Sequence, residues 1–159
     1  MSMSATAESL PDLVPSPFPT PEQRRLIRES FVRIEPAIDL VAQLFLRRLR
    51  ELAPDLCFLF PGDAQDHRRL VTALRLSVAS LDRLDDVLPA VRLLGVTQRS
   101  AGVDAGHYGA AGEALMWTLQ KSLKGNFSAE AYDAWVAFYT LLAETMYVSG
   151  ARGARSQVS

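Results

Sequence analysis

The stretch LLGVTQRSAGVDAGHYGAAGEAL, residues 93–115, contains the end of one predicted helix, a glycine-bearing corner and the start of another helix. The corner falls at Gly102, a residue type that commonly ends a helix. Just beyond it lies His107, one of the two histidines in the chain. This stretch therefore raises a question about function: whether His107 holds a metal or cofactor, or whether the residue that should do so is missing.

Helical spacing of apolar residues continues on both sides of this corner. Thr20-Pro21-Glu22-Gln23 is a typical helix start, with a capping Thr, a Pro in the first turn and a Gln three residues after the cap. No stretch shows the alternation of a β-strand between turn signals. The sequence predicts an all-α fold of six to seven helices, over residues 20–34, 36–49, 63–81, 88–101, 104–125 and 128–148.

The two ends of the chain differ in composition from the middle. Residues 1–19 contain several Pro and Ser residues, no positive charge before Arg24 and no sustained apolar run, so they are predicted to be a disordered leader and not a secretory signal. Residues 20–149 are predicted to form one domain and residues 150–159 a flexible tail. No apolar run approaches the roughly 18 residues that span a bilayer, and a cytoplasmic location is expected.

Charge and cysteine content exclude several classes of partner and site. The chain of 159 residues carries 17 basic and 18 acidic side chains, a formal charge of −1 that predicts neither nucleic-acid nor membrane binding. Its single cysteine, Cys57, excludes an internal disulfide and a cysteine-rich metal site. Glycine-rich phosphate loops, a nucleophile elbow and paired histidines at metal spacing are all missing, so a conventional enzyme is not expected. Trp117 and Trp135 lie on apolar helix faces and are predicted to be core residues.

One corner has the residues of a cofactor pocket. Phe60 closes the aromatic run CFLF seven residues before His67, and Val71 follows one helical turn after that histidine. Together with the inward-facing Leu46, these side chains would form an apolar pocket with one imidazole pointing into it. Such a pocket suits a flat, apolar metal chelate such as haem. A structural or solvent-facing His67 is the alternative.

The order of these elements resembles that of the bacterial single-domain globins and of the globin domain of flavohaemoglobins, over roughly residues 20–148. The resemblance implies that Phe60 stacks on the haem edge, that His67 occupies the distal position and that Val71 lies over the iron. Leu46 stands where the bacterial family usually has a distal Tyr, so this distal side is similar to that of an animal oxygen-storage globin. The motifs that carry the resemblance are PTPEQRRLIRESF, LFLRRLRELAPDLCFLF, LDRLDDVLPAVRLLG, AGVDAGHYGAAGEAL and AYDAWVAFY.

The same resemblance answers the question raised by the opening stretch. The family's proximal histidine lies five residues before the position of Val103, and Gln98 stands there. His107 comes nine residues too late to be that ligand. Tyr108, a usual support of the proximal histidine, is present, whereas the supporting glutamate of the last helix aligns with about Gly150. Leu94 and Val103 are expected to line the proximal wall.

An amide oxygen is a weak ligand for haem iron compared with a neutral imidazole. The hypothesis is therefore a haem b protein whose iron is ligated by His67, with small gases binding on the Gln98 side, acting as a gas or redox binder or sensor. One alternative is a bilin of the biliverdin type, formed by haem degradation in place; another is a haem-free regulatory domain. A homodimer through the last two helices is also expected.

Overall fold

The computed structural model describes residues 18–58 and 63–158, and within these ranges every regular element is helical. The predicted all-α class is therefore confirmed. Phe60 and the predicted leader as far as residue 17 lie outside the described residues. The α-helices are α2 (Pro21–Ile34), α3 (Ile38–Leu52), α4 (Ala64–Ala79), α5 (Leu84–Ser100), α6 (Ala105–Leu123) and α7 (Ala129–Val158), with short 3-10 turns η2 (Glu35–Ala37), η3 (Pro54–Phe58), η4 (Leu81–Arg83) and η5 (Lys124–Asn126).

Side-chain caps fix where several helices begin. At α2 the hydroxyl of Thr20 accepts the backbone N–H of Gln23 at 3.1 Å, and the Gln23 side chain accepts the backbone N–H of Thr20 at 2.9 Å. This reciprocal pair is the capping box predicted from the sequence. Asp63 caps α4 and Ser128 caps α7 through their side-chain oxygens. Each cap satisfies a backbone N–H that has no partner within its own helix.

Two apolar clusters hold the helices together. The larger joins α2, α3, α4, α6 and α7 around Trp135, which is 2% exposed. The smaller joins the end of α3 and η3 to the beginning of α6, and its buried members are Leu49, Ala53, Leu56, Val103 and Ala114. This second cluster connects η3 to the corner between α5 and α6, which contains Gly102 and Val103.

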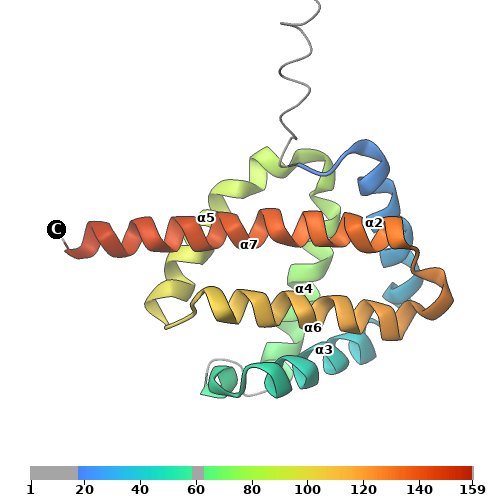
Figure 1. The fold of residues 1–159 in the computed structure, drawn as a ribbon, viewed down its shortest axis with the longest axis horizontal. Helices are drawn as coiled ribbons and strands as arrows, with labels where there is room; N and C mark the ends of the chain where they lie inside the picture. Colours follow the sequence, from blue (N-terminus) through green and yellow to red (C-terminus); the bar gives the residue numbers. More distant parts are fainter. Residues whose placement is uncertain (1–17, 59–62, 159) are drawn as a thin grey trace, which may run out of the picture.

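Figure 1 shows α7 crossing the molecule, with α6 beside it and α3 at the opposite side from α2 and α5. α7 packs on α5 and α2, whereas α3 packs on α6 and α4. The two helices that carry His67 and Gln98 therefore rest on different neighbours, α4 on α3 and α5 on α7. Among the described residues, no helix has the length and apolar character needed to cross a membrane.

Two predicted helix limits are wrong. α5 begins at Leu84 instead of near Leu88, so Pro89 lies inside it, where it cannot donate the helical hydrogen bond to the carbonyl four residues earlier. α7 continues to Val158 instead of ending near Val148, so the start of the predicted flexible tail is helical. Gly150, which was expected in that tail, is buried. Packing against α5 explains the extra length.

The contact between α5 and α7 depends on glycine. A Cβ atom added at Gly95 would lie 2.2 Å from the carbonyl oxygen of Met146, closer than any non-bonded atoms can approach. A Cβ at Gly150 would lie 2.8 Å from the Gly95 carbonyl oxygen, and one at Gly153 would lie 3.1 Å from Val96 Cγ2. The backbones of the two helices therefore touch directly. This contact sets the position of α5, the helix that presents Gln98.

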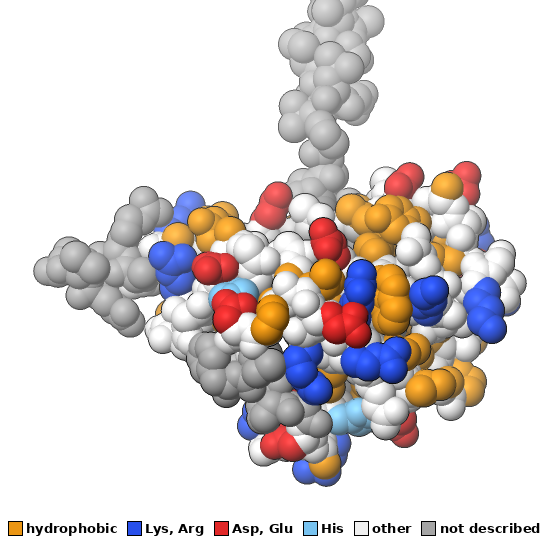
Figure 2. Space-filling view, turned by 60° about the horizontal axis from the view of Figure 1, so that its bottom comes forward, with side chains coloured by type: hydrophobic (Ala, Val, Ile, Leu, Met, Phe, Trp, Pro, Cys, Tyr) orange, Lys and Arg blue, Asp and Glu red, His pale blue; other side chains and the backbone are white. Residues whose placement is uncertain are grey.

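Trp117 is not the core residue that its apolar face predicted. Its ring is half-buried, with the Arg48 guanidinium 5.1 Å and the Lys121 ammonium 5.8 Å from the ring centroid. Two cations on one indole favour an exposed position, because the charges keep their water while they contact the ring. Hydrophobic side chains flanked by basic ones are visible on the face shown in Figure 2. Trp135 is buried, as predicted.

Candidate functional site

Gln98 lies in the last turn of α5 and has a defined partner. The Tyr108 hydroxyl, from the first turn of α6, donates a hydrogen bond of 2.5 Å to Gln98 Oε1. Leu94 lies one turn before Gln98 and so shares its face of α5, and it is 48% exposed. The structure thus brings together three of the residues predicted for the proximal side: an amide, a phenol and a large apolar side chain.

Tyr108 is in turn held by α7. The Tyr139 hydroxyl donates a 2.6 Å hydrogen bond to the Tyr108 carbonyl oxygen, and the ring of Tyr147 meets the Tyr108 ring edge-on at 6.4 Å. Gly112 makes room for Tyr139, since a Cβ there would lie 2.9 Å from the Tyr139 ring. Burial raises the pKa of both phenols, most strongly that of Tyr139, so both stay neutral.

Sequence reasoning missed Tyr139 and Gly112. The available signal was a glycine in the interior of a helix, which costs about 1 kcal/mol relative to alanine and so points to a close contact. The identity of that contact was not readable, because Tyr139 is 27 residues further along the chain.

His67 lies at the start of α4, and its ring is directed to α3. Its Nε2 donates to Asp39 Oδ1 at 3.0 Å, with the imidazole 20% and the carboxylate 83% exposed. Val71, one turn later, and Leu46 on α3 are both buried, and Val71 belongs to the larger apolar cluster, so their place in a distal wall stays a prediction. The sequence did not identify Asp39, because its contact with His67 joins residues 28 positions apart.

His107, by contrast, uses both ring nitrogens within the fold. Nδ1 accepts the backbone N–H of Asp104 at 3.1 Å, while Nε2 donates to Asp55 Oδ2 at 2.5 Å. The Asp104 carboxylate in turn accepts the backbone N–H of His107, which completes a capping box at the start of α6. His107 therefore fastens α6 to η3.

The Asp55–His107 pair gives the fold an acid-sensitive contact. The hydrogen bond from His107 lowers the pKa of Asp55 below its ordinary value of 3.8. A lowered folded-state pKa stabilises the fold above the unfolded value, and this contribution is lost as the pH falls through the folded value. We expect Asp55→Asn to lower the urea midpoint at pH 6 and to lose this difference as the pH falls below 3.8 and through the lower folded-state pKa of Asp55. A difference that persisted in acid would contradict the ionic role of Asp55.

Two other residues predicted for the cofactor pocket, Val103 and Phe60, have different outcomes. Val103 is 8% exposed and belongs to the smaller apolar cluster, beside which Tyr108 packs. Phe60 lies outside the described residues, so its stacking role stays a prediction. Within the described ranges, no group of three or more His, Cys, Asp or Glu side chains is arranged to hold a metal ion.

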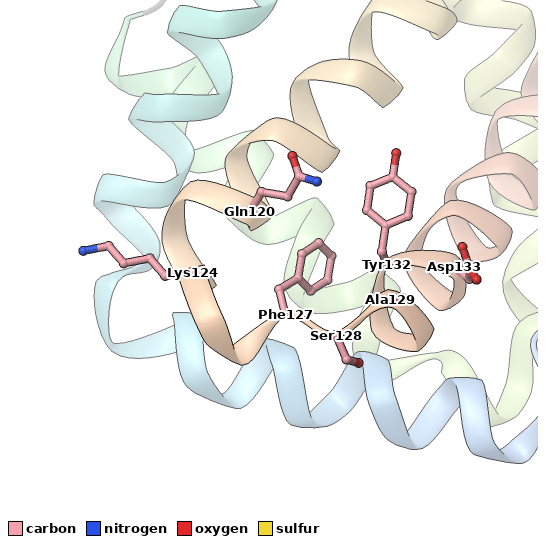
Figure 3. Close-up of a pocket in the computed structure, with 7 residues that line it drawn as sticks. All are labelled: Gln120, Lys124, Phe127, Ser128, Ala129, Tyr132 and Asp133. Atoms are coloured by element: carbon pink, nitrogen blue, oxygen red, sulfur yellow. The ribbon is translucent and has the colours of Figure 1, made fainter.

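A surface hollow lies elsewhere, at the corner that joins α6 to α7 (Figure 3). Its volume is about 470 Å³, and the rings of Phe127 and Tyr132 form its apolar part at a centroid distance of 6.0 Å. Lys124 points away from these rings in Figure 3. No residue predicted for the cofactor pocket lines this hollow, and the other lining residues are Gln120, Ser128, Ala129 and Asp133.

The globin family model matches residues 62–146, which is more than half of the chain. The helical fold and the order of α4, α5, α6 and α7 agree with that match. The chain belongs to the globin family.

Similarity to individual proteins covers most of this chain. It is 28% identical over 131 residues to a flavohemoprotein of Bordetella parapertussis, covering 80% of this chain but only 33% of that protein. It is 27% identical over 142 residues to neuroglobin-1 of Oncorhynchus mykiss, covering 89% of that globin. A hexacoordinated heme protein from an anhydrobiotic tardigrade has a similar fold, with a TM-score of 0.71 at 15% identity over 83% of this chain and 95% of that one. The chain thus spans about a third of the flavohemoprotein's length.

Proposed function

We propose that this globin binds haem b with side chains of α4 and α5, that His67 is the iron ligand, and that a gas or other small ligand is bound on the Gln98 side. In this role the protein is a gas or redox binder or sensor. The observation that carries the proposal is the difference between the two histidines. His107 uses both ring nitrogens in hydrogen bonds, whereas the bond from His67 to Asp39 uses Nε2 alone.

The residues present fit haem. A porphyrin brings four ligands of its own, so one protein imidazole is enough, and a cluster of several metal-binding side chains is not needed. Leu46 and Val71 are buried on the His67 side, while Leu94 offers a half-exposed apolar surface on the Gln98 side. When bound, haem iron supplies an open coordination position for a small ligand. The side chains of α4 and α5 would orient the ring, and Leu46 and Val71 would exclude water on the His67 side.

The relatives support the same cofactor. A flavohemoprotein and a hexacoordinated heme protein are named for haem, and neuroglobin-1 is a globin in its own right. Family membership does not decide which residue ligates the iron, because function depends on the particular side chains of the pocket. The ligation by His67 is therefore argued from this chain alone.

Titration of the purified chain with ferric haem tests the proposal. We expect a Soret band that saturates near one haem per chain, with iron in the same ratio. A protein that stays colourless after haem addition would contradict haem binding and favour the haem-free alternative. A broad red absorption without iron, in protein from haem-supplemented cells, would contradict it in favour of a bilin.

Asp39 should have only a small effect on haem uptake. Exposed ion pairs contribute at most about 1 kcal/mol, so His67 can leave Asp39 at little cost. We expect Asp39→Asn to raise haem affinity by no more than about fivefold, the equivalent of 1 kcal/mol. Competition for haem against apomyoglobin measures this change. A large loss of affinity would show instead that Asp39 supports the ligand.

A further inference from the structure

The Gln98 side carries a polar group whose two ends have different roles. We infer that Gln98 is a hydrogen-bond donor for a small anion bound at this face, with Tyr108 holding its amide oxygen so that the –NH₂ end stays available. This inference rests on the proposed function and names the ligand class of the same site.

The hydrogen bond decides the orientation of the amide. A carboxamide has one accepting oxygen and one donating –NH₂ group, and the Tyr108 hydroxyl engages the oxygen at 2.5 Å. Burial raises the pKa of Tyr108, so the phenol keeps the proton that it donates. The amide oxygen is an acceptor only, so it cannot donate a hydrogen bond to a bound anion. The end of Gln98 that remains for a ligand is therefore a donor.

The support behind Gln98 is rigid. Tyr139 holds the Tyr108 backbone through a 2.6 Å hydrogen bond, and Gly112 admits the Tyr139 ring against α6. The close contact of Gly95 with Met146 fixes α5 against α7, the helix that carries Tyr139. A donor held by such contacts loses little freedom when it binds an anion.

The donor favours an anion that accepts a hydrogen bond over a neutral gas. Leu94 shares the face of Gln98 but is 48% exposed, so the preference rests on the donor itself and not on burial. Donation to a charged acceptor is also stronger than donation to a neutral one. Carbon monoxide accepts hydrogen bonds poorly and is expected to be insensitive to Gln98.

Fluoride binding to the ferric haem-loaded chain tests the inference. Gln98→Leu removes the donor, and we expect its fluoride affinity to fall at least about tenfold, with a shift of the fluoride charge-transfer band. Carbon monoxide affinity of the ferrous form should change by less than about twofold, because a neutral ligand gains little from the donor. Gln120→Leu, a glutamine substitution in the α6–α7 corner, is the matched control and should leave both values unchanged.

The possible outcomes separate the two proposals. If Gln98→Leu takes up haem but keeps the fluoride affinity and band of the unsubstituted chain, the donor role is wrong and haem binding stands. If fluoride and carbon monoxide affinities fall together, Gln98 acts on the pocket as a whole and the inference is likewise overturned. A chain that forms no Soret band contradicts the proposed function instead.

The orientation of Gln98 is also tested without haem. The side-chain amide resonances of Gln98, assigned by their loss in Gln98→Leu, should move in Tyr108→Phe because the oxygen loses its donor. Amide resonances that do not respond to Tyr108→Phe would show that Tyr108 does not hold the oxygen, and would overturn the inference whether or not haem binds.

Discussion

Replacing His67 with alanine is expected to abolish the Soret band at haem concentrations that saturate the unsubstituted chain. Loss of an outer-shell partner of a metal ligand typically costs 10–100-fold in affinity, and loss of the ligand itself should exceed about 100-fold. No other imidazole can replace it, because His107, the second histidine, is engaged by Asp104 and Asp55. Haem titration of the variant followed by absorption measures the effect.

The control for His67→Ala is His107→Gln. Glutamine can still cap at the third helical position, so α6 should keep its start and the Soret band should remain. Free imidazole added to His67→Ala should restore the band by occupying the vacated position. If His67→Ala keeps an unchanged spectrum, the iron is not ligated by His67. If the variant loses haem and imidazole does not restore the band, the substitution has acted through the fold.

Gly95→Ala is expected to destabilise the fold more than an alanine substitution usually does. The added Cβ would lie 2.2 Å from the Met146 carbonyl oxygen. Neither atom can move without its backbone, so α5 and α7 would have to separate. Overpacking of this kind costs about 1–3 kcal/mol or more, against a helix-propensity gain of about 1 kcal/mol. Because the contact is with fixed backbone, we expect a cost at the upper end of this range and a net loss of about 2 kcal/mol, or a Tm about 4–8 °C lower.

Gly109→Ala is the matched control for Gly95→Ala. Gly109 also lies inside a helix, α6, but a Cβ there has nothing within 4 Å. Only the propensity gain remains, so this variant should be more stable by about 0.5–1 kcal/mol. Urea denaturation of both variants measures the difference. Equal stabilities for the two alanine variants would mean that α5 and α7 do not touch at Gly95.

Local sequence signals predicted the helices well where the cause is local. The capping residues Thr20 and Ser128, and the apolar spacing that follows them, act within one or two turns, and the structure has the predicted helix starts there. The same reasoning failed at the end of α7, because that end depends on a contact with α5 about 55 residues earlier in the chain, such as Gly95 with Gly150. The composition of the segment beyond residue 148 is typical of a flexible tail. In the structure, however, its glycines Gly150 and Gly153 pack against α5.

In the candidate site, too, local features were predicted from the sequence and long-range contacts were not. The predicted roles of His67 and Gln98 come from spacing and resemblance, since each residue occupies a definite place in a motif of contiguous residues. Their partners were not predicted: Asp39 lies 28 residues from His67, and Tyr139 lies 31 residues from Tyr108. Only folding brings such pairs within hydrogen-bond distance, because no local pattern encodes which helix faces meet.

The sequence by itself determined that this protein is an all-α globin, because helical periodicity and the order of motifs are properties of the linear chain. The tertiary structure decided which end of the Gln98 amide is available and which histidine is already fully engaged. Those facts depend on the direction of single hydrogen bonds between distant segments. Hydrogen bonds of this kind form only after the helices pack, so no pattern in the linear chain reveals them.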